Sequence, residues 1–194
     1  MNDDTPSAVA EVLGFWFGEP PATAPRAEWF RKDPAFDEGI RQRFGATLEA
    51  ALAGGLGHWD ATTAGALARI VVLDQFTRNA FRDTPRAFAG DALALAAAEA
   101  LVDRGADRAL APLARWFVYL PFEHAESVAQ QRRSVALFDA LAAEHPAMAD
   151  AREWAVKHQV IVDRFDRFPH RNAILGRPST PEELAFLQQP GSSF

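Results

Sequence analysis

TTAGALARIVVLDQFTRNA, residues 62–80, places apolar and charged side chains on the same face of a helix. Leu67, Val71, Asp74 and Arg78 recur at helical spacing, so this face is apolar in its first turns and carries an acid and a base in its last. An acid four residues before a base is the favourable order for an ion pair. An exposed pair adds only a few tenths of a kcal/mol, whereas a buried pair needs further polar partners and belongs to a network. The sequence leaves both interpretations open.

The rest of the chain has the same helical pattern. Alanine is its commonest residue and has the highest helix propensity. Thr180-Pro181-Glu182-Glu183 has the spacing of a capping box, which predicts a helix start, while Pro121 is expected to break the short helix before it. No segment alternates in the manner of a strand. We expect helices over residues 7–17, 34–53, 62–80, 91–104, 112–119, 125–143, 147–168 and 181–188.

These elements predict an all-α fold, a compact multi-helix bundle. The length of 194 residues suits one domain with a sizeable core and is short for two. The connections between the expected helices are short, and none is long enough to act as a linker. We therefore expect a single all-helical domain over residues 1–194.

The composition argues against several classes of function. The formal net charge is −6, which speaks against a nucleic-acid partner because such binding needs a basic surface. The chain has no cysteine, so disulfides and thiolate metal sites are excluded. The N-terminal residues lack the pattern of a secretory signal, and no apolar run reaches the roughly 18 residues of a membrane span. We expect a cytoplasmic protein that has no membrane or nucleic-acid partner; a protein partner cannot be named.

Polar residues within apolar stripes are the candidate functional residues. His158 lies in the middle of such a stripe in the helix 147–168, where a histidine is either a hydrogen-bonded core residue or a group used in binding or proton transfer. Glu123 and His124 crowd the start of the next helix; they either complement its dipole or point into a cavity. No two histidines have the spacing that puts both on one helix face, so we expect no metal and no other cofactor.

An aromatic–Arg–Asn element occurs twice, as QFTRN at residues 75–79 and within RFPHRN at residues 167–172. Each copy can simply end a helix, because asparagine tolerates the left-handed conformation and its amide can bind the last carbonyls. Alternatively, Arg78-Asn79 and Arg171-Asn172 form a positive cluster around one shared site. Such a cluster needs either protein carboxylates or an anionic ligand, and the sequence does not decide which.

Four stretches carry a resemblance to a known family: VLGFWFGE (12–19), VLDQFTRNAFRDTPRAFAGDALAL (72–95), RWFVYLPFEHAE (115–126) and RFPHRNAILGRPSTPEE (167–183). In this order they resemble the bacterial domain-of-unknown-function family DUF924. The resemblance implies an all-α fold of tetratricopeptide-like antiparallel helix pairs, and it implies no activity. Members of this family often carry proline where this chain has Thr77.

Three functions are consistent with these residues. The first is a protein that binds a small anionic metabolite, or a hydrolase-like enzyme, in which histidine carries protons and arginine holds the anion. The second is a tetratricopeptide-like module that presents a groove to a peptide or protein. In the third, the polar residues only fix the packing of the helices. Under the first hypothesis the ligand-binding residues are Asp74, Arg78, Asn79, Glu123, His124, His158, His170, Arg171 and Asn172.

Overall fold

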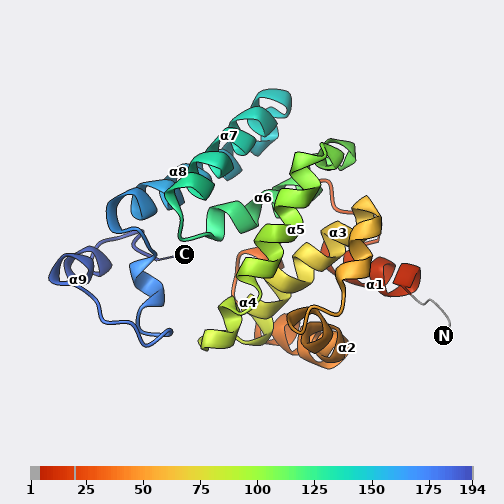
Figure 1. Ribbon diagram of the computed structural model, residues 1–194, viewed down its shortest axis with the longest axis horizontal. Helices are drawn as coiled ribbons and strands as arrows, with labels where there is room; N and C mark the ends of the chain where they lie inside the picture. The colour runs from red at the N-terminus through yellow and green to blue at the C-terminus, as the bar shows by residue number, and fades with distance from the viewer. Residues whose placement is uncertain (1–4, 20, 194) are drawn as a thin grey trace. The chain divides into compact units, whose positions relative to one another are not determined.

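Helices account for the regular structure of the chain, and the computed structural model describes residues 5–19 and 21–193 (Figure 1). No strand occurs in these two ranges, which confirms the predicted all-α class. None of the helices in the described ranges is long and apolar enough to cross a membrane. The chain divides into two compact units, which we call unit 1 (Met1–Arg82 and Arg86–Pro121) and unit 2 (Asp83–Pro85 and Phe122–Phe194).

Unit 1 is built on a helix that runs from α3 to α4. This helix packs against neighbours on several sides, because α3 contacts α1 and α5, and α4 contacts α2. Its core is aromatic: the Trp16 ring lies 5.7 Å from the Phe76 ring and 5.4 Å from the Phe117 ring, centroid to centroid. The helices of unit 1 are α1 (Thr5–Phe17), α2 (Pro34–Leu52), α3 (Thr63–Ile70), α4 (Thr77–Ala80), α5 (Asp91–Asp103) and most of α6 (Pro112–His124).

The helix expected over residues 62–80 is confirmed, with one local change of pitch. The hydroxyl of Thr62 caps its start by accepting a hydrogen bond from Gly65 N at 3.0 Å. Between α3 and α4 the turns widen into a π-helix over Val71–Phe76, all of whose residues are buried. Wider turns of this kind occur inside α-helices and are frequent at functional sites. The spacing of apolar residues did not predict this segment.

Unit 2 contains the end of α6, the helix pair α7 (Val128–Glu144) and α8 (Ala149–Phe165), and the short helix α9 (Pro181–Leu187). Helices α7 and α8 lie side by side and pack along their lengths (Figure 1). The capping box predicted at the start of α9 is confirmed: Thr180 Oγ1 accepts from Glu183 N, and Glu183 Oε2 accepts from Thr180 N.

The expected break at Pro121 is wrong. Helix α6 continues through Pro121 to His124. A proline in a helix removes one backbone hydrogen bond, but the residues on both sides of it are buried here, and Phe122 is fully so. The packing of this segment therefore outweighs the lost bond.

The left-handed conformation, one of the two alternatives considered for the asparagines, is not observed. Asn79 lies inside α4, and Asn172 has right-handed helical angles. Helix α8 ends at Phe165, three residues earlier than expected, and the residue with the left-handed conformation there is Asp166 (φ 55°). Neither asparagine ends a helix by its backbone conformation, so both are available for side-chain contacts.

Candidate functional site

The end of α6 is fixed to the first turns of α7 by one buried amide. Gln131 Nε2 donates to the carbonyl of Glu123 at 2.6 Å and to the carbonyl of Ala125 at 2.8 Å. The last carbonyls of a helix have no partner within the helix, so Gln131 supplies the donors that they lack. This contact holds the backbone of Glu123 in place.

Glu123 and His158 form a buried pair between α6 and α8. Glu123 Oε1 lies 3.0 Å from His158 Nδ1, and the two residues are only 2% and 7% exposed. His158 Nδ1 also lies 2.9 Å from the carbonyl of Trp154. Two acceptors at one nitrogen place the proton on Nδ1, which leaves Nε2 as the nitrogen that can accept a proton.

Basic side chains surround the ring of Phe168, which is fully buried. The His158 ring lies 5.6 Å from it, the His170 ring also lies 5.6 Å from it, and the guanidinium carbon of Arg171 stands 4.6 Å over its face. The His124 ring lies beside the His158 ring, and the two ring centroids are 6.1 Å apart. We call these five residues the Phe168 cluster.

The interior of the Phe168 cluster disfavours a further positive charge. Burial lowers the pKa of His170, and the positive charge of Arg171 adds to this effect, so that the pKa falls to about 4. His170 is therefore neutral near pH 7. Arg171 is only 6% exposed, so its charge acts in surroundings that contain little water.

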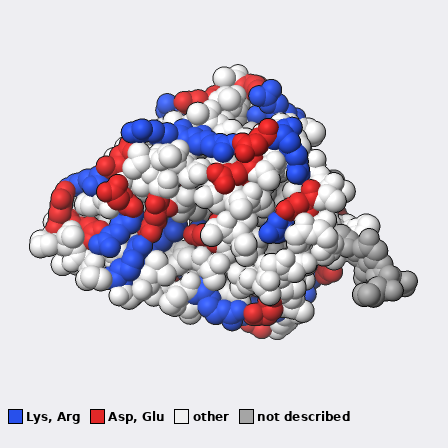
Figure 2. Space-filling model, in the orientation of Figure 1, with Lys and Arg blue, Asp and Glu red and all other residues white. Residues whose placement is uncertain are grey.

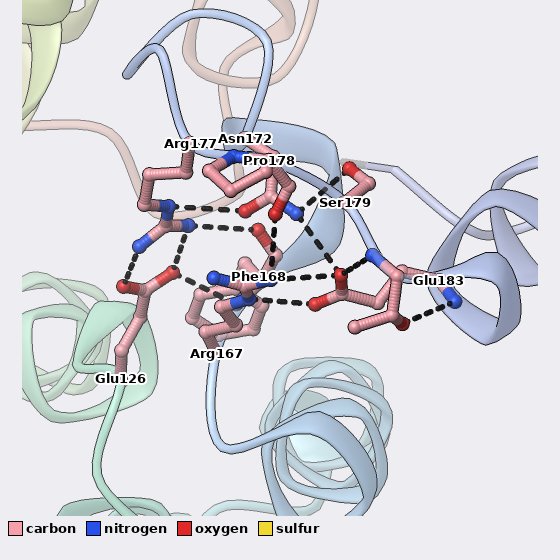
Figure 3. Close-up of polar contacts among 9 residues, drawn as sticks. Glu126, Arg167, Phe168, Asn172, Arg177, Pro178, Ser179 and Glu183 are labelled. Atoms are coloured by element: carbon pink, nitrogen blue, oxygen red, sulfur yellow. Dashed lines mark hydrogen bonds and ion pairs between the residues drawn. The ribbon is translucent and has the colours of Figure 1, made fainter.

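Two Arg–Glu pairs hold the RFPHRN segment within unit 2 (Figure 3). Arg177 donates to both oxygens of Glu126 at 2.5 and 2.8 Å, and Glu126 also accepts from the backbone of Phe168. Arg167 donates to both oxygens of Glu183 at 2.6 and 2.8 Å. Pairs with this forked geometry are among the stronger hydrogen-bonded contacts in proteins.

The pKa values of the two carboxyls agree with this geometry. Burial alone would raise the pKa of Glu126, but the hydrogen bonds from Arg177 and from Phe168 N outweigh it and lower the pKa. The hydrogen bonds from Arg167 lower the pKa of Glu183 to about 2 against the opposing effect of burial. Both carboxylates are ionised and fully engaged at neutral pH.

Asn172 belongs to this structural network. Its Nδ2 donates to Ser179 Oγ at 2.9 Å, and its Oδ1 accepts from Arg177 Nε at 3.0 Å (Figure 3). With the residue 1% exposed, the amide is occupied by protein partners on both sides. Its geometry is that of a positioning residue for the segment that carries His170 and Arg171.

The first Arg–Asn copy, in unit 1, is likewise engaged with carboxylates. Arg78 contacts Asp74 Oδ1 at 3.0 Å and donates to both oxygens of Asp91 at 2.8 and 3.1 Å. Asp74 is 1% exposed, so the buried interpretation of the Asp74–Arg78 pair is the correct one. Asn79 Nδ2 donates to Asp37 Oδ1 at 2.8 Å, and Arg82 donates to both oxygens of that carboxylate.

The nine residues predicted for the site are divided between the units. Unit 1 contains the three residues of the first copy, and unit 2 contains the other six, of which four belong to the Phe168 cluster. One site shared by both copies stays a prediction. Sequence reasoning missed the structural role of Glu126, which stands in LPFEHAE, and of Arg177, which no local pattern distinguishes from other surface arginines.

Charged residues of both signs lie side by side on the face of the molecule shown in Figure 2. The area that corresponds to α8 and α9 in Figure 1 has the same mixed character. Among residues 5–19 and 21–193, no group of three or more His, Cys, Asp or Glu side chains is placed to hold a metal ion.

Comparisons with known proteins place the chain in a family. The sequence profile of a bacterial protein family of unknown function, DUF924, matches residues 12–191, so the chain belongs to this family. The resemblance of the four motifs is thereby confirmed.

A solved structure of a protein of unknown function from Agrobacterium tumefaciens is similar, with a TM-score of 0.83 and 40% sequence identity. The match covers 95% of this chain and 99% of that protein. No curated protein matches the sequence. The comparisons therefore define the family and the fold, and the chemistry has to be inferred from the residues of the site.

Proposed function

We propose that the protein binds a small anionic metabolite at the Phe168 cluster of unit 2, as a binding protein or a hydrolase-like enzyme of the bacterial cytoplasm. The observation that carries this proposal is the buried Glu123–His158 pair at 3.0 Å in the same unit as the buried Arg171. Unit 2 thus combines a proton-transfer group with a fixed positive charge.

Arg171 supplies the affinity for an anion. Its guanidinium offers five donors in a planar fork, which suits a carboxylate or a phosphate. Burial is the main cause of the lowered pKa of His170, and the positive charge of Arg171 adds to it. That positive charge attracts a negative group. In surroundings with little water this attraction is stronger than at an exposed site.

His158 and Glu123 supply the acid–base chemistry. Glu123 Oε1 and the Trp154 carbonyl fix the proton on Nδ1, so Nε2 can take a proton from a water molecule or return one to a leaving group. The positive charge that forms on the ring is then stabilised by the carboxylate. A general base of this kind contributes about 10²–10⁴-fold to a hydrolysis rate.

Thermal-shift measurements against small carboxylates, phosphates and phosphate esters test the proposal. We expect at least one compound to raise the melting temperature of the wild-type protein and to have no effect on Arg171→Ala. The matched control is Arg164→Ala, because Arg164 lies in the same unit and forms an exposed pair with Glu182. This control should retain the response.

A second variant separates binding from folding. Arg171→Lys keeps the charge and loses the planar fork, so it should fold and bind the same compound more weakly. If Arg171→Ala and Arg171→Lys lower the melting temperature while no compound affects the wild type, the cluster only fixes helix packing and the proposal is wrong.

A further inference from the structure

Among the described residues of unit 2, three whose side chains bear on the site each have a buried oxygen atom without a hydrogen-bond partner. The atoms are Glu123 Oε2, Gln131 Oε1 and Ser134 Oγ. Their residues are at most 2% exposed. A polar atom that is removed from water without a partner costs about 1–3 kcal/mol. Three such atoms in one unit therefore need an explanation.

One contact and the helix geometry place the three residues in the same part of unit 2. Gln131 donates through Nε2 to the backbone of Glu123, so its amide lies beside that residue. Gln131 and Ser134 are both buried and stand three residues apart on α7, which places them on one helix face. Ser134 on α7 and His158 on α8 are each about ten residues from the connection between these helices. They therefore lie at similar distances along the two helix axes.

Glu123 differs from the structural carboxylates of the same unit. Glu126 and Glu183 have donors at both oxygens, from an arginine fork and from backbone amides. Glu123 has a contact at Oε1 and none at Oε2. A carboxylate that served only to fix the packing would be expected to have both oxygens satisfied, as its two neighbours do.

We infer that the ligand of the proposed site carries a primary ammonium group, which donates to Glu123 Oε2. An ammonium group has three N–H donors, and Gln131 Oε1 and Ser134 Oγ provide the two other acceptors. The negative charge of Glu123 offsets the loss of water around the ammonium group, because a charge-assisted hydrogen bond is about twice as strong as a neutral one.

This inference rests on the proposed function and narrows its ligand. An anionic group at Arg171 and an ammonium group at Glu123 together define a zwitterion, which is a small amino acid or an amino-substituted acid. Such a ligand adds no net charge to unit 2, because its own two charges cancel. Each of its charged ends lies beside a protein group of opposite charge.

The test compares matched probes on the wild-type protein by calorimetry. The probes are the ω-amino acids from glycine to 6-aminohexanoate, each measured beside the carboxylate and the amine of the same carbon number. At one chain length we expect the amino acid to bind at least about tenfold more tightly than the carboxylate and the amine of the same carbon number. A charge-assisted hydrogen bond predicts a difference of this size. Equal binding of amino acid and carboxylate would overturn the inference and leave the proposed function intact.

Variants then locate the ammonium group. Glu123→Gln should abolish the advantage of the amino acid, so that it binds no more tightly than the matched carboxylate binds to the same variant. The control is Glu182→Gln, because Glu182 is an exposed acid on α9. This variant should bind the amino acid and the carboxylate as the wild type does. Ser134→Ala is a smaller change. This variant should fold normally, and only its binding of the amino acid should be weaker. If only the amines of the series bind, the anion site at Arg171 is wrong, and so is the conclusion that the ligand is a zwitterion.

Discussion

Arg167, Arg171 and Arg177 lie close together in the sequence, but they make different contacts. Arg167 and Arg177 each donate through a fork to one carboxylate, and these contacts hold the segment in place. Arg171 instead lies over the ring of Phe168 in the interior. The residue type alone does not distinguish the roles of the three arginines; the groups that each guanidinium contacts do.

Arg177→Ala should lower the free energy of unfolding by about 1–3 kcal/mol, because it removes the arginine donor to the Asn172 amide oxygen and leaves Glu126 with the Phe168 amide alone. Arg164→Ala removes an exposed pair and should change it by no more than about 0.5 kcal/mol. Urea denaturation of the three proteins measures the difference. Equal effects of the two substitutions would show that the Glu126 pair behaves as a surface contact.

His170 should make stability depend on pH. Its pKa is about 4 in the folded protein and 6.5 in the unfolded chain, because of burial and of the nearby Arg171, His158 and His124, against an opposing effect of Glu126. Between these values the unfolded chain binds the extra proton, so stability falls as the pH decreases, by up to about 1.4 kcal/mol per pH unit. His170→Asn should remove this slope between pH 6.5 and pH 4. A slope that is unchanged in the variant would contradict the assignment.

At the scale of elements, the π-helical segment of unit 1 and the start of α5 are closely packed. A Cβ atom at Gly90 would lie 2.1 Å from the carbonyl oxygen of Leu73 in the π-helix. Gly90 has a φ of −88°, which any residue can adopt, so it is the space and not the backbone angle that requires glycine. Asp91 is the next residue in the chain, and this close approach places it beside Arg78, which donates to its carboxylate.

Gly90→Ala should destabilise the protein by at least about 2 kcal/mol, because the obstructing atom belongs to the backbone. The matched control is Gly45→Ala in α2, where a Cβ atom would meet nothing within 4 Å. That change should be neutral or stabilise by about 0.5–1 kcal/mol, since alanine favours the helix. Thermal and urea unfolding report both effects, and a neutral Gly90→Ala would refute the packing argument.

The helices and the cap at Thr180 could be predicted because their signals are local. The cap depends on residues three apart, and the helical face of residues 62–80 depends on spacing within a few turns. The continuation through Pro121 could not be predicted, since it depends on burial. The partners of Arg78 and Asn79 were equally hidden, because Asp91 and Asp37 lie 13 and 42 positions away. Periodicity does not specify which distant acid an arginine will meet.

At the scale of the whole molecule, each unit depends on ionised carboxylates beside arginines. In unit 1 burial would raise the pKa of Asp37, but hydrogen bonds from Arg82 and Asn79 lower it. In unit 2 Glu126 and Glu183 have lowered pKa values for the same kind of reason. The chain as a whole is therefore built to be stable near neutral pH and not in acid.

Acid should unfold the protein in a defined pH range. For Glu183 the stabilisation is fully present above the ordinary pKa of 4.5 and is lost as the pH falls towards the folded value of about 2, because the unfolded chain binds the proton first. Circular dichroism during urea denaturation, repeated from pH 4.5 downwards, measures this loss. Glu183→Gln should be less stable at neutral pH and should lose less stability on acidification, whereas Glu182→Gln, with its exposed side chain, should follow the wild type. A wild-type stability that stays constant from pH 4.5 to pH 2 would mean that these arginine–carboxylate pairs contribute nothing to the folded state.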